Sequence, residues 1–223
     1  MNRKFISFSK KIYQCNKCTR LVNFRNKISL KKRKSYLDQV YWGKPISGFG
    51  DLNGNIIIIG LAPAAHGATR TGRVFTGDKS ADFLFNCLFK SGLSNQPNSD
   101  HINDGLKLKN TFITLALRCV PPEDKPTKEE LKNCSAFFKE ELNMIKNKKV
   151  IVALGKIAFD ACIKFYKENY GLMGSYKFGH GSKYDINGLT IFGCYHPSPR
   201  NVNTKRINTT KMTYLFKRAK KLI

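Results

Sequence analysis

Two segments that lie far apart in the chain carry the side chains best suited to chemistry. Residues 60–78, with the sequence GLAPAAHGATRTGRVFTGD, are rich in Gly, Ala, Thr and Arg and follow the apolar run at 55–59. Residues 196–201, with the sequence HPSPRN, follow another apolar run. Loops at the carboxyl ends of buried strands are where open α/β sheets bind ligands. We therefore expect the two segments to meet in space and to form a binding site.

Two side chains in these segments are candidates for catalysis. Asp78 is the only carboxylate between Gly60 and Asp82, although Asp is also a good N-cap for the helix that we expect to follow it. His196 is held in extended geometry by Pro197, and its imidazole either makes a structural hydrogen bond or faces a ligand. Both interpretations of each residue stay open at this point.

Three further side chains of residues 60–78 suit contact with a nucleic acid. Phe75 is either a core residue or a platform on which a base stacks. Arg70 and Arg73 are either solvated surface charges or contacts for phosphate groups. The functional interpretation of all three points to the same kind of ligand.

Four of the seven cysteines are candidates for a metal centre. Cys15 and Cys18 form a C-x2-C pair, and Cys119 and Cys134 form a looser second pair, all at the edges of loop-like sequence. Four thiolates suit either a structural zinc ion or a [4Fe-4S] cluster. The alternative is four unrelated cysteines. The remaining three lie in periodic apolar stretches and are assigned to the core: Cys87, Cys162 and Cys194.

Composition favours a polyanionic partner. The 223 residues include 40 Lys and Arg against 15 Asp and Glu, which gives a formal charge of +25. Nucleic acid is the first interpretation, an anionic membrane surface the second, and a general lysine bias the alternative. No apolar run approaches the ~20 residues of a membrane span, and no apolar signal core follows the first basic residues. We expect a soluble, cytoplasmic protein without disulfides.

The elements that must position these side chains alternate between strands and helices. Strands are expected at residues 55–59, 111–117, 149–154 and 189–195. Helices are expected at residues 80–90, 127–147, 157–166 and 204–222. Thr127 and Glu130 match a capping box, whereas residues 1–50 are expected to be basic and irregular apart from a short helix at 35–40. The alternation predicts parallel βαβ units in a single α/β domain.

The same residues carry a resemblance to a known family. Residues 60–78 closely resemble the first motif of family-5 (type B) uracil-DNA glycosylases, and residues 196–201 resemble their second motif. Residues 48–51, residues 118–127 and the order of the four cysteines also look like that family. The resemblance covers most of the chain.

The resemblance implies a three-layer α/β/α fold with a small, mainly parallel four-stranded sheet. The whole chain, residues 1–223, would be one glycosylase domain with a basic N-terminal arm that carries two of the cluster cysteines. The activity would be removal of uracil, and of other deaminated or damaged bases, from DNA by a monofunctional DNA glycosylase. The four cysteines would ligate a structural [4Fe-4S] cluster, with zinc as the alternative. DNA would be the partner, no membrane is involved, and we expect a monomer.

The resemblance also implies a role for individual residues. Asp78 would match the carboxylate proposed to help catalysis in this family, and His196 would stabilise negative charge on the departing base. Residues expected to line the base pocket are Gly60, Leu61, Ala62, Ala64 and Phe75, the last by stacking on the flipped base. Residues expected to contact DNA are Arg70, Arg73, Ser198, Pro199, Arg200 and Asn201.

Two positions depart from the pattern of the family. Asp124 stands where a Pro-Pro-x-Asn-Lys-Pro pattern is common, and its carboxylate makes it a further catalytic candidate near the sugar. Residues 204–206 read Thr-Lys-Arg where Thr-Gly-Arg is common, and by the resemblance this difference is expected to alter contact with DNA. Two alternatives to an active glycosylase therefore stay open. One is a diverged homologue that has lost activity, and the other is a non-catalytic nucleic-acid-binding protein with a structural zinc ion.

Overall fold

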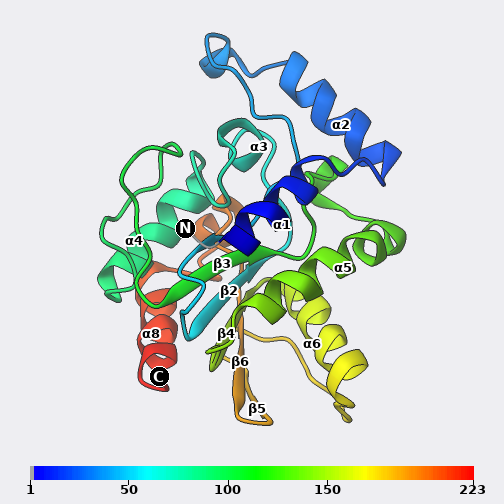
Figure 1. The fold of residues 1–223 in the computed structure, drawn as a ribbon. Coiled ribbons are helices and arrows are strands. Elements are labelled where there is room, and N and C mark those ends of the chain that lie inside the picture. Colours follow the sequence, from blue (N-terminus) through cyan, green and yellow to red (C-terminus); the bar gives the residue numbers. More distant parts are fainter. Residues whose placement is uncertain (1–2) are drawn as a thin grey trace.

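A six-stranded sheet with helices on both faces forms the centre of the protein (Figure 1). The structure is a computed structural model that describes residues 3–223. The strands are β1 (Phe49–Gly50), β2 (Ile56–Gly60), β3 (Thr111–Leu115), β4 (Val150–Leu154), β5 (Lys183–Ile186) and β6 (Leu189–Cys194). Their order in the sheet is β1-β3-β2-β4-β6-β5, with the four central strands parallel and the two edge strands antiparallel.

The mainly parallel sheet is confirmed, but the predicted count of four strands is wrong. The four central strands are runs of buried residues, with a single half-buried position in β6, and this is the pattern that sequence analysis finds most readily. The two edge strands carry no such run. β1 has only two residues, and three of the four residues of β5 are exposed or half-buried.

Helices fill the layers above and below the sheet. They are α1 (Arg3–Tyr13), α2 (Thr19–Leu30), α3 (Ala68–Thr71), α4 (Lys79–Lys90), α5 (Lys128–Met144), α6 (Lys156–Tyr170), α7 (Pro199–Asn203) and α8 (Thr209–Lys220). Two short 3-10 helices are η1 (Lys34–Tyr36) and η2 (Pro122–Asp124). The capping box of Thr127 and Glu130 is confirmed at the start of α5. Among the described residues no helix is long and apolar enough to cross a membrane.

The prediction that residues 1–50 are irregular is wrong, because α1 and α2 lie there. α1 is a basic amphipathic helix that buries Phe8 and Ile12, and its many charges hide that short apolar pattern in the sequence. The helix expected at 35–40 is only the single turn η1.

Alternate residues of the central strands point to opposite faces of the sheet, and this produces the expected three layers. Ile56 and Ile58 of β2 pack in one core cluster with side chains of α4 and α8. Ile57 and Ile59 pack in a second cluster with side chains of α5 and α6. The three cysteines assigned to the core, Cys87, Cys162 and Cys194, are buried.

The strand register places the two candidate segments at the same edge of the sheet. β2 and β6 both pair in parallel with β4, with Ile59 opposite Ala153 and Leu154 opposite Cys194. The chain therefore leaves β2 and β6 on either side of the carboxyl end of β4. This is the position at which α/β sheets bind ligands.

Candidate active site

The two candidate segments meet as expected. The ring of Phe75 and the imidazole of His196 lie with their centroids 6.0 Å apart and their planes tilted by 33°. Phe75 lies directly over Gly60, because a Cβ added there would come within 2.8 Å of the Phe75 ring. A side chain at position 60 would displace this ring. Phe75 also has a φ of 48°, in the left-handed region that costs a bulky residue energy and that clusters at functional sites.

His196 is largely enclosed, and burial lowers the pKa of its imidazole to about 4. The imidazole is therefore neutral near pH 7 and presents one N–H donor and one acceptor nitrogen. The amide of Asn201 donates to the carbonyl oxygen of His196 at 2.9 Å. On the other side, the backbone N–H of Tyr195 donates to Nδ1 of His180 at 3.4 Å. His180 supports this loop, and sequence analysis missed it because nothing in the sequence brings residue 180 to residue 195.

Asp78 is the N-cap of α4, so the capping interpretation is confirmed. Its Oδ1 accepts hydrogen bonds from the backbone N–H groups of Ser80 at 2.9 Å and Ala81 at 3.0 Å. Burial raises the pKa of this carboxyl above its ordinary value. The second oxygen, Oδ2, lies against Gly67, where an added Cβ would come within 1.8 Å of it. Both backbone N–H groups donate to Oδ1, and capping is therefore compatible with a further role for Oδ2.

The prediction that Arg73 contacts DNA is wrong. Its side chain is 4% exposed, and its guanidinium forms a two-pronged ion pair with Asp104, at 2.9 and 2.6 Å. It also donates to Ser99 at 2.8 Å and to Thr76 at 2.9 Å. Burial alone would raise the pKa of Asp104, but the Arg73 guanidinium and two backbone N–H groups hold it well below its usual range. The sequence places Asp104 in a polar loop 31 residues away, so this partner was not expected.

Arg70 is half-buried, and its guanidinium holds the first segment together. Nε donates to the carbonyl oxygen of His66 and Nη2 to that of Gly77, both at 2.7 Å. Nη1 donates to Oε1 of Gln39 at 2.5 Å, and the guanidinium lies 4.0 Å from the centre of the Tyr36 ring. Contact between Arg70 and DNA stays a prediction.

The other residues expected to line the pocket follow the end of β2. The N–H of Ala116 donates to the carbonyl oxygen of Gly60 at 2.9 Å, and the N–H of Leu117 donates to that of Leu61 at 2.8 Å. Leu61 and Ala62 are half-buried and Ala64 is exposed. This short stretch is therefore anchored beside β3, while its small side chains stay accessible.

The residues expected to contact DNA in the second segment lie at the start of α7. Ser198 caps this helix by accepting from the N–H of Asn201 at 3.4 Å, and Pro199 and Arg200 are exposed. Lys205, which stands where the family pattern commonly has Gly, has a φ of 57°, and only glycine adopts this region without cost.

Asp124 lies apart from this constellation. It is exposed in η2, and among residues 3–223 no hydrogen bond, ion pair or ring contact joins it to Asp78 or His196. The neighbouring carbonyl of Lys125 accepts from Arg20 of α2 at 3.1 Å, which ties this turn to the N-terminal segment. A catalytic role for Asp124 stays a prediction.

The four candidate cysteines lie near one another, beside Ala62 of the first segment. Cys18, Cys119 and Cys134 pack in one small cluster that also includes Ala62 of the first segment. Cys15 is close enough to Cys119 and Cys134 for the charged sulfurs to interact. Burial raises the pKa of the Cys119 thiol to about 12. Within the described part of the chain no group of three or more His, Cys, Asp or Glu side chains is placed to hold a metal ion.

Several polar hydrogens point at these sulfur atoms. Nη1 of Arg25 donates to Sγ of Cys119 at 3.2 Å, and Nδ2 of Asn133 donates to Sγ of Cys18 at 3.6 Å. A backbone N–H of Arg118 donates to Cys134. Donors and a cation around sulfur stabilise thiolates and anionic clusters. The donors around these sulfur atoms therefore suit thiolates.

A buried ion pair beside the cysteines also escaped the sequence analysis. Arg118 and Glu141, both almost fully buried, pair at 2.8 Å. Glu141 also accepts from the hydroxyl of Thr114 and, at 2.8 Å, from the N–H of Gly48. This network joins the end of β3, helix α5 and the turn before β1. Its one sequence signal is an acidic residue at a helix position that faces the core.

Comparison with known proteins agrees with this geometry. The family model described as Uracil DNA glycosylase superfamily matches residues 47–220. The Type-5 uracil-DNA glycosylase of Pyrobaculum aerophilum is 41% identical over 212 residues, which cover 95% of this chain and 90% of that protein. The protein of the same name from Mycobacterium tuberculosis is 41% identical over 93% of this chain and 78% of its own. That from Thermus thermophilus is 38% identical over 97% of both chains. The chain, with its two motif loops joined at Phe75 and His196, belongs to the uracil-DNA glycosylase superfamily.

Proposed function

We propose that this protein is a monofunctional DNA glycosylase that hydrolyses the N-glycosidic bond of uracil in DNA. The observation that carries the proposal is the contact between Phe75 and His196. It brings an aromatic ring and a neutral imidazole to the loop edge of the sheet, in a chain of this superfamily. Asp78 supplies a carboxylate three residues from the ring.

The reaction places opposite charges on its two products. As the bond from C1′ to the base nitrogen breaks, positive charge develops on the sugar and negative charge on the base. Water then attacks C1′ and loses a proton, and the base leaves with the electron pair of the broken bond. Groups fixed in advance at the positions of these charges lower the barrier most effectively.

The pocket residues match the departing base. Phe75 stacks on the extruded ring, and the single N–H of neutral His196 donates to the base oxygen that gains charge. The base must first leave the stack, which costs a few kcal/mol. The lining of residues 60–64 has only small or aliphatic side chains. This supports acceptance of other deaminated or damaged bases.

A carboxylate next to the sugar stabilises the opposite charge. Asp78 is the better placed of the two candidates, because it belongs to the same loop as Phe75, whereas Asp124 lies exposed in η2. Its raised pKa follows from burial, and one of its oxygens remains for the water or the sugar while the other caps α4.

We also propose that Cys15, Cys18, Cys119 and Cys134 hold a [4Fe-4S] cluster. The proposal is supported by their convergence and by the donors that face their sulfur atoms. When bound, the cluster would stabilise the fold beside the pocket, since the hydrolysis requires no electron transfer. Purified protein should be brown and contain iron and acid-labile sulfide, and a colourless protein with stoichiometric zinc would overturn this assignment.

The activity is tested with duplex and single-stranded oligonucleotides that each carry one uracil, hypoxanthine or ethenocytosine. Excision leaves an abasic site, which alkali cleaves and a gel reveals. We expect cleavage of the uracil substrates by stoichiometric enzyme. No cleavage of any substrate, with DNA binding retained, would instead identify a homologue that has lost activity.

A further inference from the structure

The segment that follows α2 has no role in the proposed chemistry, yet its surface is unusual. We call residues 30–40 the basic tip. Leu30, Leu37 and Val40 in this segment are 83%, 63% and 91% exposed. They are three of the five most exposed large apolar side chains in residues 3–223. Exposed apolar side chains gathered on one short segment mark an interaction site more often than scattered ones do.

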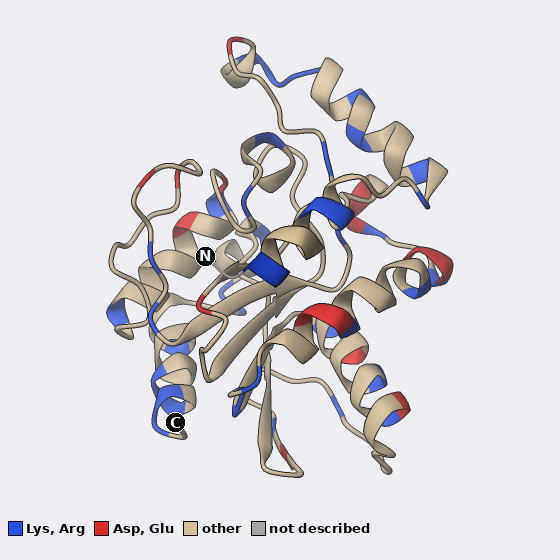
Figure 2. Ribbon diagram, viewed as in Figure 1, with Lys and Arg blue, Asp and Glu red and all other residues tan. Residues whose placement is uncertain are grey.

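The basic tip carries positive charge between these apolar side chains. Lys31, Arg33 and Lys34 are exposed, whereas Lys32 is half-buried and donates from Nζ to the carbonyl oxygen of Leu37 at 3.2 Å. Asp38 is the single acidic residue of the segment. Figure 2 shows the blue run and this one red position together at the top of the molecule.

The basic tip is fastened to the loop that forms the pocket. Arg70 reaches Gln39 and the Tyr36 ring on one side and the carbonyl oxygen of Gly77, the residue before Asp78, on the other. The hydroxyl of Tyr41, next to the tip, lies 2.9 Å from Nδ1 of His66. In Figure 1 the segment projects beyond α3, on the side of the sheet from which the motif loops leave. A ligand bound between the two motif loops would therefore lie next to the basic tip.

We propose that the basic tip is a second DNA-contacting element, separate from the pocket and from the loop at residues 198–201. Lys31, Arg33 and Lys34 bind phosphates of the duplex beside the damaged nucleotide. Leu37 and Val40 pack against the sugar edges of the groove. Phosphates attract Lys and Arg by releasing condensed counterions, and proteins that bind grooves often place apolar side chains next to basic ones. The proposal rests on the proposed function, because it assumes that DNA occupies the pocket.

The charge pattern of the basic tip favours DNA over a protein as its binding partner. The four cations at 31–34 form one run, with the exposed Leu30 before it and the exposed Leu37 and Val40 after it. The whole chain is also strongly basic, at +25. A protein interface would instead be depleted of lysine at its centre.

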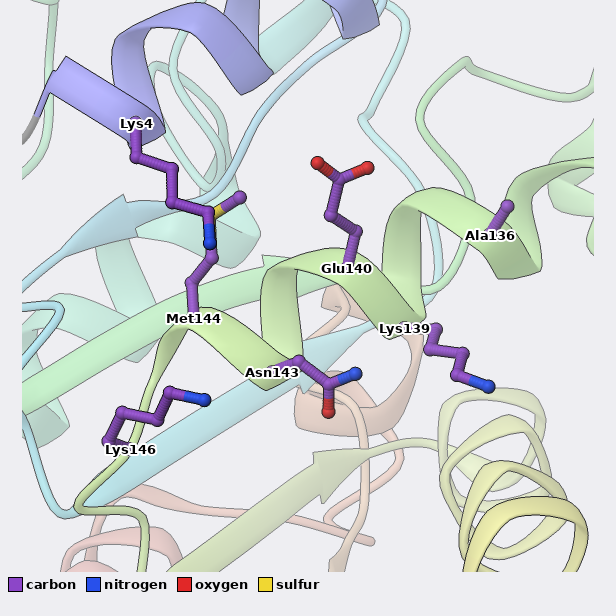
Figure 3. Close-up of a pocket in the computed structure, with 7 residues that line it drawn as sticks. All are labelled: Lys4, Ala136, Lys139, Glu140, Asn143, Met144 and Lys146. Atoms are coloured by element: carbon purple, nitrogen blue, oxygen red, sulfur yellow. The ribbon is translucent and has the colours of Figure 1, made fainter.

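A matched pair of variants tests the phosphate contacts proposed for the cations of the basic tip. The tip variant combines Lys31→Ser, Arg33→Ser and Lys34→Ser. The control variant removes the same charge from α5 and the turn before β4, and combines Lys139→Ser, Lys146→Ser and Lys149→Ser. Two of the control lysines line a hollow of about 410 Å³ between α1 and α5 (Figure 3). All three are exposed and lie in α5 or in the turn that leads into β4.

Binding is measured against salt with a duplex that carries 2′-fluoro-2′-deoxyuridine, which the enzyme would bind but cleave very slowly. We expect the tip variant to bind about 10-fold more weakly and its log–log salt slope to fall by about one for each phosphate that it no longer binds. The control variant should keep a slope close to that of the wild type. If the tip and control variants had equal salt slopes and equal affinities for the duplex, the proposal would be overturned. The basic tip would then be assigned to binding of a protein partner.

The apolar part is tested separately by Leu37→Ser combined with Val40→Ser. The matched control is Met173→Ser, since Met173 is 84% exposed and lies in the loop after α6. We expect the tip pair to lower affinity for the duplex at least 3-fold, with no change of salt slope, and Met173→Ser to have no effect. An unchanged affinity in the tip pair would exclude groove contact.

Two further measurements distinguish a misfolded variant, a failure of the inference about the basic tip and a failure of the proposed function. Melting temperatures of all variants show whether a weaker binder is simply misfolded, and none is expected to unfold, because the substituted side chains are exposed. Uracil excision by the wild-type protein tests the proposed function itself. Excision without a tip effect would overturn only the inference about the basic tip, whereas absence of excision would overturn the proposed function.

Discussion

The side chains of the proposed base-binding site are each fixed by an interaction that also shapes their chemistry. Phe75 is held over Gly60 in a strained backbone conformation. His196 is kept neutral by burial, and Asp78 keeps one oxygen on the N-terminus of α4. These fixed positions are what electrostatic preorganisation requires, because they need no rearrangement when charge develops.

Replacement of His196 tests its proposed role toward the base. We expect His196→Ala to lower the single-turnover rate of uracil excision by roughly 100-fold or more, the usual cost of losing one donor to a developing charge. Binding of the 2′-fluoro duplex should change little, because most affinity comes from phosphate contacts. An unchanged excision rate would remove His196 from the mechanism.

The capping and catalytic roles of Asp78 separate in one pair of substitutions. Asn caps helices nearly as well as Asp, whereas Ala loses the cap at a cost of ~1 kcal/mol. We therefore expect Asp78→Asn to keep the melting temperature of the wild type but to excise uracil much more slowly. Asp78→Ala should lower both the melting temperature and the excision rate. Asn208→Ala, which removes the cap of α8, is the matched control and should lower stability only. If Asp78→Asn excised at the wild-type rate, Asp78 would be a cap and nothing more.

Acid stability provides an independent test of the environment of His196. Its pKa is about 4 in the folded protein and 6.5 ordinarily, so that between these values the unfolded chain binds a proton that the folded chain does not. The free energy of unfolding should therefore fall as the pH decreases from about 6.5 to about 4, by up to ~1.4 kcal/mol per pH unit. Urea unfolding of wild-type protein and of His196→Gln at several pH values should show a smaller decline in the variant. If the free energy of unfolding fell equally with pH in both proteins, the imidazole of His196 would be exposed to solvent.

At the scale of the elements, buried strands were predictable and polar connections were not. The four central strands are apolar runs, and the start of α5 has a capping box, so local sequence was sufficient for both. The pairs formed by Arg73 with Asp104 and by Arg118 with Glu141 join residues far apart in the chain. Neither partner looks unusual in its own segment, and Arg73 was therefore mistaken for a DNA contact. Similarly, the sequence predicted which loops meet but not that Arg70 and His180 support them.

The buried pair of Arg73 and Asp104 should be essential to the shape of the first motif. Asp104→Asn leaves the guanidinium of Arg73 buried without its counter-charge, and this typically costs about 3–5 kcal/mol. We expect a loss of stability on that order in urea, together with slower excision, because Arg73 lies two residues before Phe75. Asp185→Asn breaks an exposed pair with Lys183 and should cost less than ~1 kcal/mol. Equal effects of the two substitutions would contradict the structural role assigned to Arg73.

At the scale of the whole molecule, the cysteine cluster connects the N-terminal segment to the pocket. Cys18 of this segment and Ala62 of the first motif pack against the same small core cluster, and Arg20 of α2 pairs with Glu130 of α5 at 2.7 Å. The positive charge that first indicated DNA is spread over the whole chain, and composition alone did not show where the basic tip lies.

Loss of one cysteine ligand should therefore lower the stability of the whole protein. We expect Cys134→Ser to lose bound iron and visible absorption and to unfold at a lower temperature than wild-type protein. Cys87→Ser is the matched control, because Cys87 is buried in the core near α8 and belongs to no candidate centre. The measurements are iron and sulfide content and the melting temperature. Retention of the full metal content by Cys134→Ser would contradict the ligand set.

The central claim is that a nucleobase turned out of the DNA helix binds between the two motif loops. A crystal structure of the protein with a duplex that carries 2′-fluoro-2′-deoxyuridine tests this most directly. The account predicts that the uracil ring stacks on Phe75, with His196 at a base oxygen and Asp78 on the side of the sugar. A uracil still stacked in the helix, or bound away from these three side chains, would contradict it.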